Sequence, residues 1–362
     1  MSFNPQVPLY EDQPSQHAPV APMAPDAELA RLGEKLPRGV YLGASSWNFP
    51  GWRDIVYSPM SGERSLARHG LSAYSRHPVL RTVGIDKGFY KPINEAEFAF
   101  FAEQVPENFR FLVKAPQQVT DCVLRDRFGR ATDRNKNFLN TALAVDTFIE
   151  PALKGLGEKA GPLVFEMSPI PRQLIRESAE QHAFIDRMAA FFEALPKKTC
   201  GAHPLYCVEM RTAQLLTPRF VKAIRETGVR LVIGIHPSLP PIQRQIAALR
   251  AFDEAGEGED GWMPQGDVVV RWSLSTFGGN YRQLKADWSP FNEIHARDAV
   301  TRSGLAWLAG RAVAAGRRFF AVANNKAEGC APVTMRELAA MIVENDIKGR
   351  ERQADRPLSG QD

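Results

Sequence analysis

Charged residues recur at one kind of place in this sequence, at the ends of short apolar runs. Two of them are Glu166 and Glu209, each of which ends a run typical of a buried strand. Two carboxylates close together in a poorly solvated pocket repel each other, which raises the pKa of one and allows general acid and base catalysis. An equally simple interpretation pairs each glutamate with a lysine or arginine in a structural ion network. The residues leave both interpretations open.

Basic residues at the same kind of position predict an anion-binding pocket. Lys114, Arg211 and Arg271 each lie at or just beyond the end of an apolar run. The segment Phe277–Tyr281, which contains two adjacent glycines, follows the run of Arg271. Backbone N–H groups in glycine-containing loops of this kind bind phosphate in many barrels. The expected ligand is therefore a small anionic molecule, phosphorylated or sugar-like.

Further polar and aromatic side chains extend the expected pocket. The additional candidate ligand-binding residues are Ser45, Trp47, Asp86, Tyr90, Asn324 and Asn325. Aromatic rings at a pocket mouth stack on a planar base or a sugar, or form an apolar lid. The sequence does not distinguish these roles.

Two other functions are compatible with the same residues. Asp86, Glu166, Glu209 and His236 are possible ligands of a divalent ion, in a metal-dependent phosphodiesterase, an endonuclease-like enzyme or an isomerase. However, only one of them is a histidine, and no H-x-H or E-x-x-H spacing supports a metal site, so we assign no metal ligand and no cofactor. A non-catalytic binding protein is the other alternative, and whether the chain is an enzyme stays open.

Eight apolar runs must position these side chains. They are Val40–Ser45, Val79–Ile85, Phe109–Lys114, Pro162–Met167, Tyr206–Met210, Arg230–Ile235, Val268–Trp272 and Phe319–Ala323. Segments with helical periodicity, such as Phe184–Leu195, lie between them. Strands that alternate with helices form a parallel sheet, and eight such units predict a single (β/α)8 TIM-type barrel, with an open doubly wound sheet as the competing architecture. In a barrel, the strand ends meet at one mouth.

Composition divides the chain into three parts. Residues 1–37 contain seven prolines, so we expect a disordered tail over residues 1–38, with helical turns only at Asp26–Lys35. Residues 39–348 form the barrel domain. Residues 349–362 are expected to form a flexible C-terminal tail.

Overall composition narrows the class of protein. The chain has 362 residues, a formal net charge of +4 and four cysteines without C-x-x-C spacing. This charge falls short of that of a typical nucleic-acid-binding protein, although nucleic acid is not excluded as a partner. We see no secretory signal and no membrane-spanning run, and we expect a cytoplasmic protein with free thiols. The oligomeric state cannot be inferred.

The motifs at the strand ends together resemble the YecE-like family, also called domain of unknown function 72. They are Gly43–Trp47 with Trp52–Arg53, Thr82–Asp86 with Phe89–Tyr90, Phe111–Ala115, Gly161–Phe165, Val208–Arg211, Val270–Arg271 and Ala323–Asn325. The resemblance spans residues 41–332 and implies a (β/α)8-type barrel without an established activity.

This sequence departs from the family pattern at several positions. Gly84 stands where the resemblance implies Glu, Asp121 and Ser273 stand where it implies His, and Glu166 stands where it implies Gln. These changes remove two histidines and one acid from the expected pocket. The extra Glu166 either compensates for them or indicates a different ligand.

Overall fold

Eight parallel strands close into a barrel in the computed structural model, which describes residues 20–58, 61–254 and 261–354, with side chains as far as residue 348. The strands neighbour one another in the order β1-β10-β9-β8-β7-β6-β3-β2. Their bounds are β1 Val40–Ala44, β2 Leu80–Ile85, β3 Arg110–Lys114, β6 Ala160–Met167, β7 Tyr206–Met210, β8 Arg230–Ile235, β9 Val268–Trp272 and β10 Phe319–Ala323. The predicted single (β/α)8 barrel is confirmed, and the competing open sheet is excluded because the barrel closes between β1 and β10.

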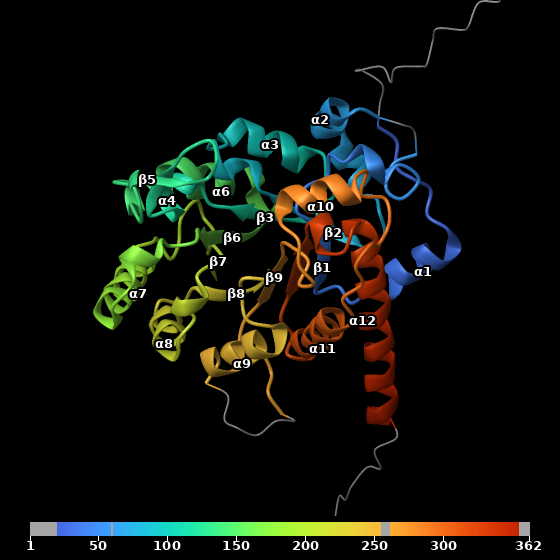
Figure 1. The fold of residues 1–362 in the computed structure, drawn as a ribbon. Coiled ribbons are helices and arrows are strands. Elements are labelled where there is room, and N and C mark those ends of the chain that lie inside the picture. Colours follow the sequence, from blue (N-terminus) through green and yellow to red (C-terminus); the bar gives the residue numbers. More distant parts are fainter. Residues whose placement is uncertain (1–19, 59–60, 255–260, 355–362) are drawn as a thin grey trace, which may run out of the picture.

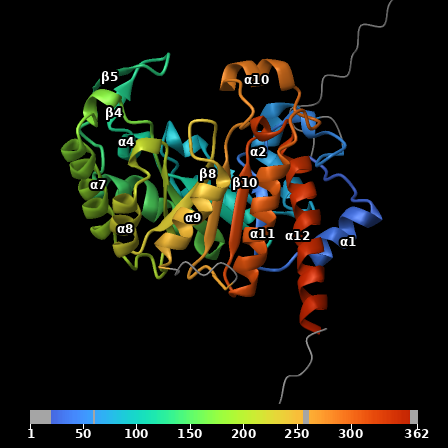
Figure 2. The same ribbon diagram turned by 60° about the horizontal axis from the view of Figure 1, so that its bottom comes forward.

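Helices surround the barrel and connect its strands (Figure 1). They are α1 Ala27–Lys35, α2 Glu63–Tyr74, α3 Glu95–Glu103, α4 Gln117–Thr120, α5 Thr141–Ala144, α6 Glu150–Leu156, α7 Ser178–Glu193, α8 Pro218–Glu226, α9 Ile242–Phe252, α10 Tyr281–Trp288, α11 Ala299–Ala314 and α12 Ala331–Ala354. A hairpin that the sequence did not predict, β4 Val123–Arg125 and β5 Ala131–Arg134, follows β3. Figure 2 shows this hairpin and α10 at the same end of the barrel.

Two separate apolar cores result from the alternation of side chains along the strands. The large core lies between the strands and the helices and includes Phe165, Val208 and Val270. A small cluster fills the barrel interior and consists of Leu112, Val164, Cys207, Val232, Val269, Phe320 and Val322. Successive side chains of a strand point to opposite faces, so the next interior positions on four of these strands are Lys114, Glu166, Glu209 and Arg271. The charged side chains therefore lie on top of an apolar plug.

The N-terminal segment is ordered before the predicted domain boundary. Asp26 caps α1 by accepting a hydrogen bond from the N–H of Leu29 at 2.7 Å. Leu29 and Leu36 are buried, and Pro22 forms a β-bridge with Tyr57. The few apolar residues among the prolines thus suffice to anchor residues 20–38, whereas the part of the predicted tail before residue 20 lies outside the described residues.

At the other end, α12 continues to Ala354, past the predicted boundary at residue 348. The rest of the predicted C-terminal tail lies outside the described residues. All four cysteines are free thiols, as expected. In the described part of the chain, no helix is long and apolar enough to cross a bilayer.

Candidate functional site

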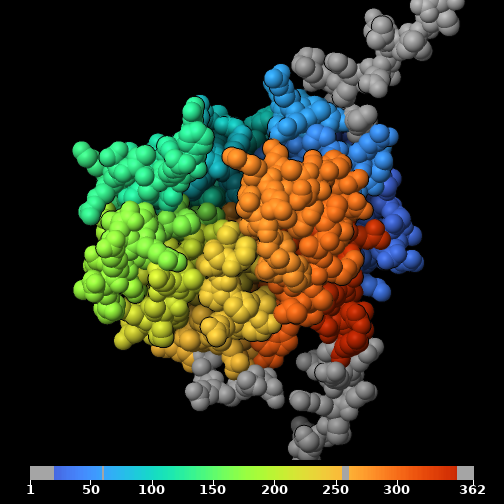
Figure 3. Space-filling view, in the orientation of Figure 1, coloured from blue at the N-terminus to red at the C-terminus, as the bar shows by residue number. Residues whose placement is uncertain are grey.

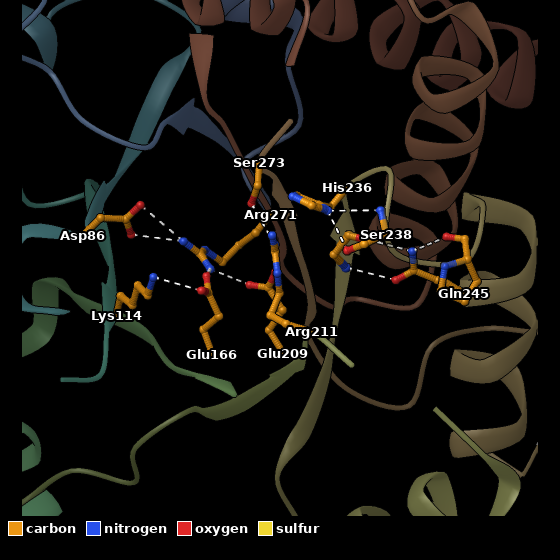
Figure 4. Close-up of polar contacts among 12 residues, drawn as sticks. Asp86, Lys114, Glu166, Glu209, Arg211, His236, Ser238, Gln245, Arg271 and Ser273 are labelled. Atoms are coloured by element: carbon orange, nitrogen blue, oxygen red, sulfur yellow. Dashed lines mark hydrogen bonds and ion pairs between the residues drawn. The ribbon is translucent and has the colours of Figure 1, made fainter. Parts of the chain in front are cut away.

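Arg271 lies at the centre of a network of charges inside the barrel. Its side chain is buried, with 4% of the residue exposed, and its Nη1 donates hydrogen bonds to Glu166 and Glu209. Its Nη2 lies 3.2 Å from each carboxylate oxygen of Asp86. Figure 4 shows the guanidinium group between Asp86 on one side and the two glutamates on the other. One arginine thus links three carboxylates from three different strands or strand ends.

Two more cations complete this arrangement. Lys114 Nζ lies 3.0 Å from Glu166 Oε1 and 3.7 Å from the centre of the Phe89 ring. Arg211 Nη1 lies 2.7 Å from Glu209 Oε1. We call Asp86, Lys114, Glu166, Glu209, Arg211 and Arg271 the ion network. Its three positive and three negative charges balance, which favours the structural ion pairing left open by the sequence.

The protonation states follow from this geometry. Burial alone would raise the pKa of Glu166, but Arg271, Lys114 and Arg211 outweigh it and hold that pKa well below its ordinary value. Burial would lower the pKa of Arg271, but Glu209, Asp86 and Glu166 raise it above its ordinary value. For Glu166 the pKa shift is therefore opposite in direction to the rise that two adjacent carboxylates alone would cause, and this carboxylate is ionised at neutral pH.

A cavity of about 350 Å³ opens above the ion network. It is lined by Ser45, Ser46, Phe49, Asp86, Tyr90, Lys114, Glu166, Arg211, His236, Arg271, Trp272, Ser273, Leu274, Tyr281, Val322 and Asn324. Six of these residues lie two positions beyond an interior residue of their strand. They are Ser45, Asp86, Arg211, His236, Ser273 and Asn324. They form the next interior layer, because that spacing returns a side chain to the same face.

Three predicted site residues do not line this cavity. Glu209 lies beneath it, nearly fully buried in the ion network. Trp47 is buried, donates from Nε1 to the carbonyl of Leu66 at 3.1 Å, and borders a smaller recess of about 130 Å³. Asn325 is buried, and its Oδ1 accepts hydrogen bonds from Trp52 Nε1 at 3.2 Å and from the N–H of Ala331 at 2.9 Å. Trp47 and Asn325 thus hold loops in place.

The cavity is also lined by residues outside the set of candidate ligand-binding residues, among them Phe49, Tyr281 and His236. Phe49 and Tyr281 supply aromatic faces from loops or from the start of a helix. The sequence suggests His236 only as a possible metal ligand. Burial, and then Arg211, lowers the pKa of His236 to about 4, so its imidazole is neutral at pH 7. Its Nδ1 accepts a hydrogen bond from the N–H of Ser238 at 3.1 Å (Figure 4).

The alternative metal site is not supported by these positions. Within the described ranges, no group of three or more His, Cys, Asp or Glu side chains is placed to hold a metal ion. The guanidinium of Arg271 lies where Asp86, Glu166 and Glu209 converge, and it uses their oxygens as hydrogen-bond acceptors. The carboxylates thus surround a cation that the chain itself supplies.

The departures from the family pattern have different consequences. Ser273 lines the cavity, and its Oγ accepts a hydrogen bond from Arg211 at 3.3 Å. Asp121 lies away from the cavity and binds Arg125 at 2.6 Å, at the base of the hairpin. A Cβ atom on Gly84 would lie 3.0 Å from Ser45 Cα, so this glycine fits the close approach of β1 and β2.

Comparison with known proteins identifies one family. The family model described as "Protein of unknown function DUF72" matches residues 41–357. A solved DUF72 protein from Enterococcus faecalis has 15% identity and a TM-score of 0.51, over 85% of this chain and 95% of that one. A DUF72 protein from Thermotoga maritima has 16% identity and a TM-score of 0.48, over 84% of this chain and 98% of that one. No curated protein matches the chain.

Proposed function

This chain belongs to the DUF72 family, also known as YecE-like, and we propose that the mouth of its barrel binds a small polar ligand of sugar-like character. The observation that carries this proposal is the cavity above the ion network. Its lining combines hydroxyl and amide groups with the aromatic rings of Phe49, Tyr90 and Tyr281. Pockets with a few fixed polar groups and apolar walls are typical small-molecule sites.

The floor of the cavity is suited to hydroxyl groups. The carboxylate of Asp86 is 36% exposed and presents acceptor oxygens, while Ser45, Ser273 and Asn324 offer neutral groups that both donate and accept. Because the charges below are paired with one another, the floor is pre-organised and needs no counter-ion from the ligand. Such a surface favours a polyhydroxylated molecule over a compact anion.

The three cations that the sequence predicts as anion-binding groups already form ion pairs with carboxylates of the protein. Lys114, Arg211 and Arg271 each pair with a carboxylate at 3.2 Å or less. They can still orient a ligand through remaining N–H groups, but they add no net charge to the floor. Any negatively charged group of the ligand must therefore find its counter-charge elsewhere in the mouth.

The geometry favours binding over acid–base catalysis by the two glutamates. Glu209 is buried beneath the cavity, and the pKa of Glu166 is held below its ordinary value by its cationic neighbours. Glu209 therefore has no direct access to the cavity, and Glu166 is ionised at neutral pH and has no proton to donate. In this proposal their role is to hold Arg271, and through it the cavity floor.

A thermal-shift screen tests the proposed function. Neutral sugars and polyols, together with their phosphate esters, should include at least one compound that raises the melting temperature of the wild-type protein. Tyr90→Ala and Ser45→Ala, which change the cavity wall, should reduce that stabilisation. Phe100→Ala, which removes an exposed aromatic ring on α3, is the matched control. The proposal fails if no neutral sugar or polyol stabilises the protein, or if the cavity variants respond like the control.

A further inference from the structure

A buried lysine next to the cavity has no counter-charge. Lys326 follows β10 in the short turn Asn325–Ala327, and only 2% of the residue is exposed. Its Nζ lies 3.8 Å from the ring centre of Tyr281 and 4.9 Å from that of Phe291. In the described part of the chain, no carboxylate forms an ion pair with it. Aromatic faces only partly replace the solvation that a buried ammonium group loses.

Lys326 is connected to the cavity through two of the lining residues. Tyr281 lines the cavity and presents one ring face to Lys326. Asn324 also lines the cavity, and its Oδ1 accepts a hydrogen bond from the backbone N–H of Lys326 at 3.0 Å. The ammonium group, with which no carboxylate of the described residues pairs, therefore packs against the ring of Tyr281, a residue that lines the cavity and begins α10. Figure 3 shows the segment around α10, in orange, on the same face of the molecule as the green hairpin.

The loop before α10 carries backbone donors and is joined to Lys326 at both ends, through the hydrogen bond from the N–H of Ser275 to the carbonyl of Lys326 at 2.7 Å and through the ring of Tyr281. Gly278 and Gly279 have φ angles of 113° and 85°, a conformation that side-chain-bearing residues rarely adopt. Asn280 caps α10 by accepting hydrogen bonds from the N–H groups of Arg282 and Gln283. Among the described residues, the N–H groups of Gly278, Gly279 and Asn280 donate no hydrogen bond within the chain. Free amides in a loop that is joined to an uncompensated cation are the elements of an anion site.

We propose that Lys326 and the Gly278–Asn280 loop form a subsite for a phosphate monoester group of the ligand. The inference deepens the proposed function and rests on it, because the cavity above the ion network would hold the rest of the molecule. A phosphate group supplies the negative charge that Lys326 lacks and accepts hydrogen bonds from the free amides. The ligand class is therefore a phosphorylated, polyhydroxylated metabolite.

The electrostatic state of Lys326 agrees with this geometry. Burial, and then the neighbouring Lys285, lowers the pKa of Lys326 to about 8. A bound phosphate would raise that pKa again, because it favours the charged form of the amine. Binding should therefore be accompanied by proton uptake near pH 8, which can be measured by calorimetry in buffers of different ionisation enthalpy.

The test uses inorganic phosphate as the probe. In a titration followed by 31P NMR, the wild-type protein should bind phosphate, and Lys326→Met should weaken binding about tenfold or more. Lys348→Met, which removes a lysine paired with Glu344 on the exposed face of α12, should bind like the wild type. Lys326→Met should also fold at least as stably as the wild type, because it removes an unpaired buried charge. Equal phosphate binding by the wild type and Lys326→Met overturns the inference, as does the absence of phosphate binding to the wild type.

A matched pair of ligands separates this inference from the proposed function. A neutral sugar and its phosphate monoester are compared on the wild type and on Lys326→Met. If the ester binds more tightly only when Lys326 is present, the subsite is supported. If phosphate binding depends on Lys326 but no neutral sugar binds, the proposed function fails and the subsite stands. If the sugar binds and the ester gains nothing, the subsite fails and the proposed function stands.

Discussion

Arg271 on β9 forms a buried ion pair with Glu209 on β7, across the strand that separates them. The intervening strand β8 carries Gly234 opposite Arg271 in the register. A Cβ atom at Gly234 would lie 3.0 Å from Glu209 Oε1. The absence of a side chain there leaves room for two long side chains to meet over β8. The ion network therefore depends on a small residue as much as on the charged ones.

Replacing Arg271 should strongly destabilise the protein. Arg271→Met leaves Glu209 and Glu166 buried without their main partner, which costs about 3–5 kcal/mol of unfolding free energy. Urea unfolding at pH 7 measures this loss. Arg219→Met is the control, because Arg219 forms an exposed pair with Asp186 whose removal costs about 0–1 kcal/mol. If both variants lose the same free energy, Arg271 does not hold the network together.

The same variant should show an altered pH dependence. The pKa of Glu166 is lowered in the folded protein, so its ion pairs stabilise the fold above the unfolded pKa of about 4.3 and lose their effect as pH falls further. In Arg271→Met the stranded carboxylates take up protons more easily. The difference in unfolding free energy between wild type and variant should therefore shrink when the pH is lowered from 7 to 3. A constant difference would contradict this assignment.

Gly234→Ala should destabilise the protein through crowding. The added methyl group meets both Glu209 Oε1 and Leu239 Cδ1 at 3.0 Å, so one of them must move. Overpacking of this kind costs about 1–3 kcal/mol. Gly310→Ala in α11, where a Cβ atom has nothing within 4 Å, is the matched control and should be neutral or stabilising. Thermal unfolding of both variants measures the contrast, and equal melting temperatures would contradict it.

The residues at the strand ends were predictable because side chains alternate along a strand. Glu166 and Arg271 stand out as charges in apolar runs, and the interior position of each follows from the same alternation. The sequence predicts both Asn324 and Asn325 in the pocket, but neighbouring residues point to different sides, and only Asn324 lines the cavity. The alternation of side chains holds only within a strand. It therefore could not predict the direction of the Trp47 side chain, which lies in the loop after β1.

The remaining cavity residues depend on loops, whose course has no periodic signal. Phe49 reaches the mouth from the segment after β1, and Tyr281 is the first residue of α10, so its position depends on the loop that leads into this helix. The sequence also could not predict the direction of the Glu166 pKa shift, because that direction depends on the distances from Glu166 on β6 to Lys114 on β3 and to Arg271 on β9. A pair of adjacent carboxylates raises a pKa only when no cation lies between them, and here Arg271 does.

Asn324 and Asn325 should differ sharply when each is replaced by alanine. Asn325→Ala leaves the buried N–H groups of Trp52 and Ala331 without an acceptor, and each unsatisfied donor costs about 1–3 kcal/mol. Asn324→Ala changes the cavity wall and should lower ligand affinity with a smaller loss of stability. Urea unfolding and the thermal-shift response to the best ligand separate the two effects. Equal stability losses would show that both asparagines are structural.

His236 should make a separate contribution to the pH dependence of stability. Its folded pKa of about 4 lies below the unfolded value of about 6.5, so the unfolded chain binds more protons in this window. Stability should therefore rise with pH from 4 to 6.5, with a slope below roughly 1.4 kcal/mol per pH unit, because the ring is partly solvated. His236→Gln should flatten this slope, while buried His77, whose pKa is also lowered to about 4, remains in both proteins. Urea unfolding at several pH values, with His69→Gln on the exposed face of α2 as control, measures the difference. An unchanged slope in His236→Gln would show that this imidazole is protonated in the folded protein as readily as in the unfolded chain.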